Sequence, residues 1–275
     1  MPEHPREAAS WRQALRATAP CGEPLRATLA LVVLAVAAVA GGAQLHGAPQ
    51  DLRYPDAYDY AQMGRQLSEG AGMTSLQAFP YVVGWLDAAG YDTAPPWPIV
   101  WRFPLPVVAR ALSFQWFGAT DTAALLPALL FSVLAAPALF LFANRLGGPL
   151  AGLLAATLWI ASPSQQQFAL SGLTEPGAAL LAVGIAGAAL FARDDTGWRR
   201  SLLLGAVLGA SFLHRANLLA LAPVACAIVA FAPGLESRER LTRLAAVSAT
   251  SLVAAPILIF FGSPASLVDA ATHRH

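Results

Sequence analysis

Charged and titratable side chains are scarce in this sequence, so the few that interrupt its apolar stretches are the first candidates for chemistry. Asp, Glu, Arg and Lys make up 12% of the 275 residues, whereas soluble domains average about 25%. The candidates are Asp56, Glu175, His214 and Arg215. A carboxylate can take a proton from a hydroxyl group, and a planar guanidinium suits the oxygens of a phosphate. The pattern therefore indicates acid–base chemistry beside an anion site.

Asp56 lies near the start of a predicted helix over residues 54–70, which Gly70 ends. The apolar stripe expected on this helix consists of Tyr60, Met63 and Leu67. Asp56 lies four residues before Tyr60 and continues the stripe, so we expect it to face the protein or the membrane. We expect Asp59 to lie on the solvent-exposed face of the helix. An inward carboxylate would serve as a general base. The alternative is an N-cap at Asp56, with Asp59 three residues on as in a capping box.

Glu175 is the only acidic residue between Ala123 and Phe191, a region that is otherwise almost entirely apolar. An ionisable group at membrane depth is costly and is by default a functional candidate. The alternative is a helix start, with Thr174 as the cap and Glu175 in the first turn beside Pro176. The expected topology places Glu175 at the outer end of its helix, on the same side as Asp56.

His214 and Arg215 interrupt the apolar run from Ser201 to Phe231. They are expected either to bind an anion such as phosphate or to extend from a helix end to the membrane surface. Arg102 is a second candidate cation. Its alternative role is that of an arginine wedged among aromatic side chains of the membrane interface.

The composition predicts an all-α, polytopic membrane helix bundle. Residues of apolar type make up 56% of the chain, and its mean hydropathy is +0.54, which indicates lipid as the solvent. We expect about seven hydrophobic helices, near residues 27–44, 122–143, 149–164, 174–192, 199–213, 216–233 and 241–262. A cleavable signal peptide is the alternative for the first of them.

The hydrophobic pattern divides the chain into a tail over residues 1–26, a transmembrane domain over 27–262 and a second tail over 263–275. Within the transmembrane domain, residues 45–121 are rich in aromatic, acidic and proline residues, which favours a large external loop with short interfacial helices. Arginines concentrate in every second connection, which indicates a cytoplasmic N-terminus. The arginines expected inside are Arg6, Arg12, Arg16, Arg26, Arg145, Arg193, Arg199, Arg200, Arg238, Arg240 and Arg243.

Several classes of protein are excluded by what the sequence lacks. It has no P-loop, Rossmann glycine pattern, nucleophile elbow or Cys/His cluster. Its net charge of +1 indicates no nucleic-acid partner. The two cysteines, Cys21 and Cys226, are far apart and favour neither a disulfide framework nor a metal site.

The order of short motifs resembles the N-terminal half of the GT-C membrane glycosyltransferases, which include protein O-mannosyltransferases and lipid A aminoarabinose transferases. The resemblance covers roughly residues 27–232. The motifs that carry it are Asp56 with Tyr60 after one N-terminal helix, Arg102-Phe103-Pro104-Leu105, Phe117-Gly118, Ser162-Pro163, Leu173-Thr174-Glu175-Pro176, and Gly205 and Gly209 ahead of His214-Arg215.

This resemblance implies an enzyme of the plasma or inner membrane that moves a sugar from a polyprenyl-phosphate donor to a lipid, glycan or protein acceptor on the extracytoplasmic face. It implies that Asp56 is the base, that Glu175 is a second catalytic acid, and that Arg215 steadies the leaving phosphate. Arg102, His214 and Tyr60 are the further candidates for substrate contacts. The sequence requires no cofactor, although a divalent metal is a candidate.

Three departures from the family pattern support an alternative. The second acid of the first loop is replaced by Ala57, the chain has no Lys, and relatives are usually much longer. The alternative is a truncated, non-catalytic relative or a partner subunit that binds a lipid carrier. A small transporter would show an internal repeat, and we find none in the sequence.

Overall fold

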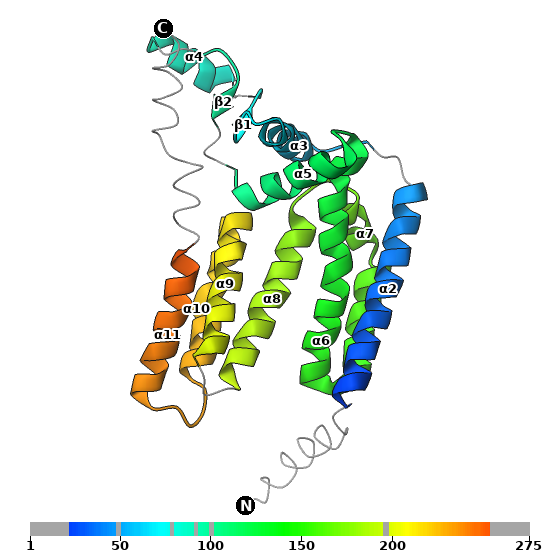
Figure 1. Cartoon of the computed structure of the whole chain (residues 1–275), viewed down its shortest axis with the longest axis vertical. Helices are drawn as coiled ribbons and strands as arrows, with labels where there is room; N and C mark the ends of the chain where they lie inside the picture. The colour runs from blue at the N-terminus through cyan, green and yellow to red at the C-terminus, as the bar shows by residue number, and fades with distance from the viewer. Residues whose placement is uncertain are drawn as a thin grey trace, which may run out of the picture.

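Helices make up almost all of the regular structure. The computed structural model describes residues 22–47, 51–77, 80–90, 93–98, 102–194 and 198–253. The helices within these ranges are α2 (Glu23–Gly47), α3 (Pro55–Ser68), α4 (Pro80–Ala88), α5 (Pro104–Phe117), α6 (Asp121–Ala161), α7 (Pro163–Ala169), α8 (Glu175–Arg193), α9 (Arg199–His214), η1 (Ala216–Leu221), α10 (Ala222–Ala230) and α11 (Ser237–Leu252) (Figure 1). The predicted all-α class is confirmed, with one addition: β1 (Thr74–Ser75) pairs antiparallel with β2 (Trp97–Pro98).

Among the described residues, three helices are long and apolar enough to cross a bilayer, namely α2, α6 and α8. The predicted helices over 122–143 and 149–164 both fall within α6, where Gly147 and Gly148 have non-helical backbone angles. Gly148 has a φ of 80°, which favours glycine. A Cβ atom at Gly152 would lie 2.7 Å from the carbonyl oxygen of Phe140, so the segment after this break runs back beside the one before it.

The remaining predicted helices match shorter elements. Residues 199–213 form α9, residues 216–233 contain η1 and α10, and α11 covers the start of the predicted helix over 241–262. The rest of that helix, the tail over 263–275 and residues 1–21 lie outside the described residues. Because none of these shorter helices is long enough to cross a bilayer alone, seven spans remain a prediction.

The segment predicted to be an external loop lies across one end of the bundle (Figure 1). Within it, α3 packs closely on α5, because Gly64 leaves room for the neighbouring backbone. A Cβ atom at Gly64 would come within 2.7 Å of Cβ of Arg110. The cluster under α3 joins Ala57 and Ala61 to Phe114 of α5 and to Ala124 of α6. This packing fixes α3 to the end of the bundle.

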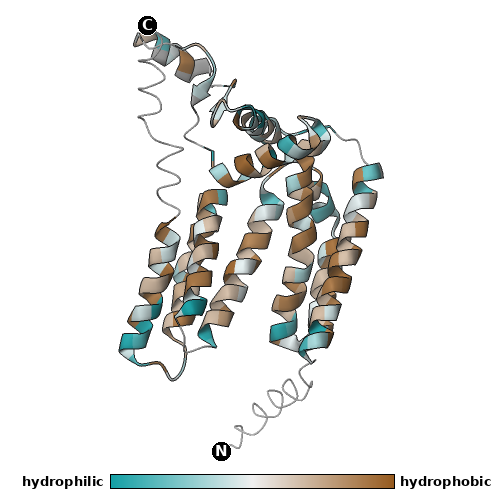
Figure 2. Ribbon diagram, viewed as in Figure 1, coloured by the Kyte–Doolittle hydropathy of each residue, from teal (hydrophilic) through white to brown (hydrophobic). Residues whose placement is uncertain are grey.

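Apolar residues predominate along the long helices, and polar residues concentrate toward their ends (Figure 2). On α2 the side chains of Leu31, Val36 and Val39 are all exposed, as expected of a surface that contacts lipid. At the end opposite α3, Arg145 forms an ion pair with Asp194. The three apolar helices make this a multi-pass membrane protein.

Candidate functional site

Arg102 holds two carboxylates of α3. Its Nη2 atom donates to Oδ1 of Asp56 at 2.6 Å, and its Nε atom donates to Oδ2 of Asp59 at 2.7 Å. The guanidinium carbon lies 5.0 Å from the centre of the Tyr60 ring. Burial opposes the charge on Arg102, but the hydrogen bonds to both carboxylates raise its pKa above the ordinary value. Arg102 therefore stays cationic and fixes the start of α3.

The exposures of Asp56 and Asp59 are the reverse of the prediction. The side chain of Asp56 is 60% exposed and that of Asp59 only 9%. Asp56 shares the face of the buried Tyr60, but it lies in the first turn of α3, where no further turn covers it. Asp59 lies on the flank, which β1 covers, and Ser75 of β1 donates a hydrogen bond to it at 3.4 Å. The periodicity of one helix could not show which neighbours cover its flank.

The N-cap role proposed as an alternative for Asp56 is wrong. Tyr54 is the N-cap residue of α3, no side chain caps the helix, and Pro55 occupies the first turn. Asp56 is thus a first-turn acid with an accessible carboxylate. Such a position is favourable for a negative charge, because the helix dipole is positive at this end.

Glu175 and Arg215 form the second cluster. Nη1 of Arg215 donates to Oε1 of Glu175 at 2.9 Å, and each side chain is about one-third exposed. The other oxygen of Glu175, Oε2, is buried without a hydrogen-bond partner. Glu175 begins α8 as predicted, after Thr174, whose side chain makes no capping hydrogen bond. Glu175 therefore does more than begin α8. It also orients the guanidinium of Arg215, which follows the end of α9.

His214 lies inside the protein, which contradicts the predicted alternative of a side chain that reaches the surface. It is 1% exposed, and its Nε2 atom lies 2.9 Å from the carbonyl oxygen of Thr174. Its ring meets Phe131 edge-on, with 5.8 Å between ring centres. His214 therefore joins α9 to the start of α8, and only its neighbour Arg215 is open to solvent.

Arg110 is a residue of this end of the bundle that the sequence analysis missed. It is 2% exposed and donates hydrogen bonds to the carbonyl oxygens of Pro106 and Gly172. Its guanidinium lies 5.1 Å from the Tyr60 ring centre, on which Arg102 also packs. Burial lowers the pKa of Arg110 to about 10 and raises that of Tyr60. The sequence signal available was only an arginine within an apolar helix.

Tyr60 was predicted to contact substrate, but it is 6% exposed. Its ring lies near two guanidiniums, from Arg102 and Arg110, which is the arrangement of a cation–π contact. The place of Tyr60 is therefore behind Arg102, where it supports that side chain.

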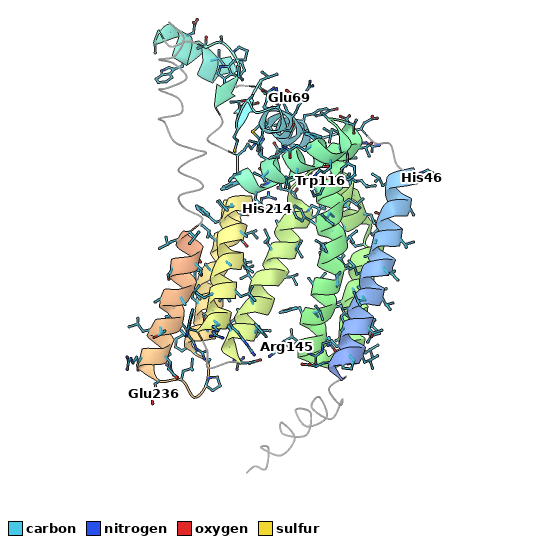
Figure 3. All side chains as sticks on the ribbon, in the orientation of Figure 1. His46, Glu69, Trp116, Arg145, His214 and Glu236 are labelled. Atoms are coloured by element: carbon cyan, nitrogen blue, oxygen red, sulfur yellow. The ribbon has the colours of Figure 1, made fainter. Side chains whose placement is uncertain are left out.

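The two clusters lie at the same end of the bundle. Phe103, next to Arg102, packs on Phe212 of α9 with 6.5 Å between ring centres. Gly172, which accepts the hydrogen bond from Arg110, lies three residues before Glu175. Figure 3 shows His214, Trp116 and Glu69 toward this end, and Arg145 and Glu236 at the other. The predicted convergence of Asp56, Glu175 and Arg215 is thus compatible with the fold.

The described ranges contain no group of three or more His, Cys, Asp or Glu side chains that could hold a metal ion.

The fold and this arrangement define a multi-pass membrane protein with paired acids and arginines gathered at one end of its helices. The model of the family described as dolichyl-phosphate-mannose-protein mannosyltransferase matches residues 102–260. Because the match covers more than half of the chain, the protein belongs to this family of polyprenyl-phosphate-sugar-dependent membrane glycosyltransferases. Arg102, Glu175, His214 and Arg215 lie within the matched range, whereas Asp56 and Tyr60 precede it.

Comparison of the chain with curated proteins and with solved structures finds no match.

Proposed function

We propose that this protein transfers mannose from a polyprenyl-phosphate carrier to a hydroxyl group of an acceptor. The family supports the donor class, and the observation that carries the proposal is the approach of two acid–arginine clusters at one end of the bundle. A hydroxyl nucleophile needs a base, and a phosphate leaving group needs a cation. The two clusters supply these groups from different helices.

Asp56 is the proposed base. Its carboxylate is accessible to substrate, whereas Asp59 is covered. Arg102 bonds only one oxygen of Asp56 through its Nη2 atom, which leaves the second oxygen of the carboxylate for an acceptor hydroxyl. The role of Arg102 is then to orient Asp56, and Tyr60 fixes Arg102 from behind.

Arg215 is the proposed partner of the leaving phosphate. It is partly exposed at the end of α9, and its Nη1 atom is held by Glu175. A guanidinium presents several donors, so the nitrogens that Glu175 does not occupy remain for phosphate oxygens. Glu175 acts on the reaction by positioning Arg215, and buried His214 fixes the backbone beside it.

The reaction that this geometry supports is a displacement at the anomeric carbon of mannose. The acceptor oxygen forms a bond to that carbon as the bond from the carbon to the phosphate oxygen breaks. The proton of the hydroxyl passes to Asp56, and the bonding electrons leave with the polyprenyl phosphate. Arg215 stabilises the charge that grows on the departing oxygen.

The test is transfer of radiolabelled mannose from polyprenyl-phosphate mannose by the purified full chain in lipid nanodiscs. Loss of a general base lowers a rate by about 10²–10⁴-fold, so we expect that loss for Asp56→Asn. Asp121→Asn is the matched control, because Asp121 is an exposed first-turn acid of α6.

An Asp56→Asn variant that transfers mannose as fast as the control would refute the role of Asp56 as the general base. Binding of the donor by the wild-type chain with no transfer to any acceptor would favour the alternative of a non-catalytic lipid-binding relative.

A further inference from the structure

A hollow lined by both polar and apolar groups opens beside α3, on the side of α2 and α7. Its volume is about 430 Å³, which is within the range of small-molecule sites, about 300–1,000 Å³. The residues that line it are Gln44, Gly47, Arg53, Tyr54, Pro163, Gln166, Gln167, Leu170 and Ser171. Hydroxyl, amide and guanidinium groups thus gather at one place between separate helices.

Arg53 gives this hollow its charge. It is the only charged residue among the described residues that line the hollow, and no carboxylate of these parts of the chain forms an ion pair with it. The neighbouring Tyr54 hydroxyl accepts a hydrogen bond from Nε2 of Gln167 at 2.9 Å. A cation among neutral hydrogen-bonding groups favours an anion that also carries hydroxyl groups.

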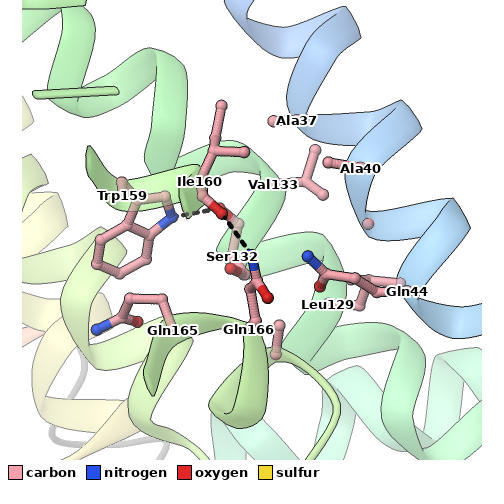
Figure 4. Close-up of a pocket in the computed structure, with 12 residues that line it drawn as sticks. Ala37, Ala40, Gln44, Leu129, Ser132, Val133, Trp159, Ile160, Gln165 and Gln166 are labelled. Atoms are coloured by element: carbon pink, nitrogen blue, oxygen red, sulfur yellow. Dashed lines mark hydrogen bonds between the residues drawn. The ribbon is translucent and has the colours of Figure 1, made fainter. Parts of the chain in front are cut away.

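A narrow slot of about 30 Å³ lies beside the hollow, between α2, α6 and α7. Gln44 of α2 and Gln166 of α7 line both spaces, and both extend into the slot (Figure 4). The other residues of the slot are mostly apolar, and they include Ala37, Leu129 and Val133. The adjacent face of α2 is exposed and apolar, so a hydrocarbon chain can remain in the bilayer while its head group enters the hollow.

The start of the helix that carries the proposed base also borders the hollow. Tyr54, which lines it, is the N-cap residue of α3, and Asp56 lies in the first turn of the same helix. The Glu175–Arg215 pair belongs to α8 and α9, which do not line the hollow. Two substrates could therefore reach Asp56 from different sides.

We propose that the α2–α7 hollow binds the acceptor, and that this acceptor is a membrane lipid whose head group carries a phosphate and hydroxyl groups. The inference rests on the proposed transfer reaction. It also departs from the family description, which names a protein as the acceptor.

The probe is phosphatidylglycerol that carries a photoactivatable diazirine in one acyl chain, because its head group has a phosphate and two hydroxyl groups. The full chain in nanodiscs is irradiated, and labelled peptides are measured by mass spectrometry. We expect labelling on α2 and α7, and about a tenfold loss for Arg53→Gln, which removes a charge-assisted hydrogen bond. Arg65→Gln is the control, because Arg65 is exposed and pairs with Glu69.

A second pair of variants introduces a bulky side chain, inside the hollow in one variant and outside it in the other. Gly47 lines the hollow and Gly42 does not, and a Cβ atom at either glycine would meet nothing within 4 Å. Gly47→Phe should therefore reduce labelling while Gly42→Phe keeps it, with both variants folded. Equal labelling of these two variants would overturn the lipid site.

The role of the lipid as acceptor has its own readout. With radiolabelled polyprenyl-phosphate mannose, the mannosylated product should appear in the organic extract as a labelled lipid that chromatography separates from the donor, and Gly47→Phe should lose it. Radiolabel that stays with protein, or labelling of the hollow without any mannosylated lipid, would overturn the acceptor assignment. Asp56→Asn should keep photolabelling, so failure of the transfer chemistry can be told apart from failure of the lipid site.

Discussion

Arg110 places a positive charge in a position that water does not reach. Burial lowers its pKa from the ordinary value to about 10, which corresponds to about 3 kcal/mol. The folded-state pKa is the lower one, so the unfolded chain holds the proton more tightly, and the cost is present in full at neutral pH. The residue nevertheless joins Tyr60 to the loop that precedes Glu175.

We predict that Arg110→Met raises the melting temperature of the purified protein and lowers mannose transfer. Methionine removes the buried charge and roughly keeps the volume, a kind of change that is often neutral or stabilising. The measurements are thermal unfolding in detergent and the transfer assay, with Arg65→Met as an exposed control. A lower melting temperature would show that the hydrogen bonds to Pro106 and Gly172 outweigh the burial cost.

The candidate residues were easier to identify from the sequence than the environments of their side chains. Glu175 and Arg215 stood out because each breaks an apolar run, and the structure pairs them. Asp56 and Asp59 were assigned to the wrong exposures, because β1 and Arg102, which cover Asp59, come from distant parts of the chain. Arg110 was missed because a single arginine in an apolar helix carries no pattern.

At the scale of elements, the contact between α8 and α9 sets the distance from Glu175 to Arg215. Gly177, in the first turns of α8, lies against the ring of His214. A Cβ atom there would come within 2.6 Å of Nε2 of His214 and 2.9 Å of Phe131. Because the ring is enclosed, it has little room to move aside.

We predict that Gly177→Ala lowers both the melting temperature and the rate of transfer, because the added methyl group must displace His214 and separate the two helices. Gly187→Ala on the same helix is the matched control. Nothing lies within 4 Å of a Cβ atom at Gly187, and alanine favours a helix by about 1 kcal/mol over glycine. Equal effects of the two variants would contradict the tight contact.

The helices themselves were predicted well where apolar runs are long. Residues 27–44 and 174–192 match α2 and α8, since burial in lipid demands such runs. The break within 122–164 was expected between the helices, and Gly147-Gly148 provides it. The placement of α3 and α5 across the end of the bundle could not be predicted from the sequence, because it depends on the close approach of the two helices at Gly64.

The whole molecule has two chemically different ends. Arg145 and Glu236 lie at one end, and Glu69 and His214 toward the other (Figure 3). Several arginines of the predicted inner connections, including Arg199 and Arg238, begin helices near the first end. The positive-inside rule therefore favours a cytoplasmic location for that end and an extracytoplasmic location for the candidate site.

Labelling of single cysteines tests this orientation. In a chain with Cys21→Ser and Cys226→Ala, we expect Glu69→Cys to react with a membrane-impermeant maleimide in intact cells. Glu236→Cys should react only after the membrane is opened. The opposite pattern would place the candidate site in the cytoplasm and exclude an extracytoplasmic acceptor.

The proposed reaction requires both acid–arginine clusters to act on one transition state. Groups that act as a unit give strongly non-additive losses when they are removed. Asp56 and Arg215 come from opposite clusters and have no direct ion pair with one another, so any coupling between them in the rate would arise through the substrate.

The most direct measurement is a double-mutant cycle on the single-turnover rate of mannose transfer, with Asp56→Asn, Arg215→Gln and the double variant. We predict that the double variant is slower than the worse single variant by no more than about tenfold. Losses that multiply in full, or a single variant with the wild-type rate, would contradict one shared site.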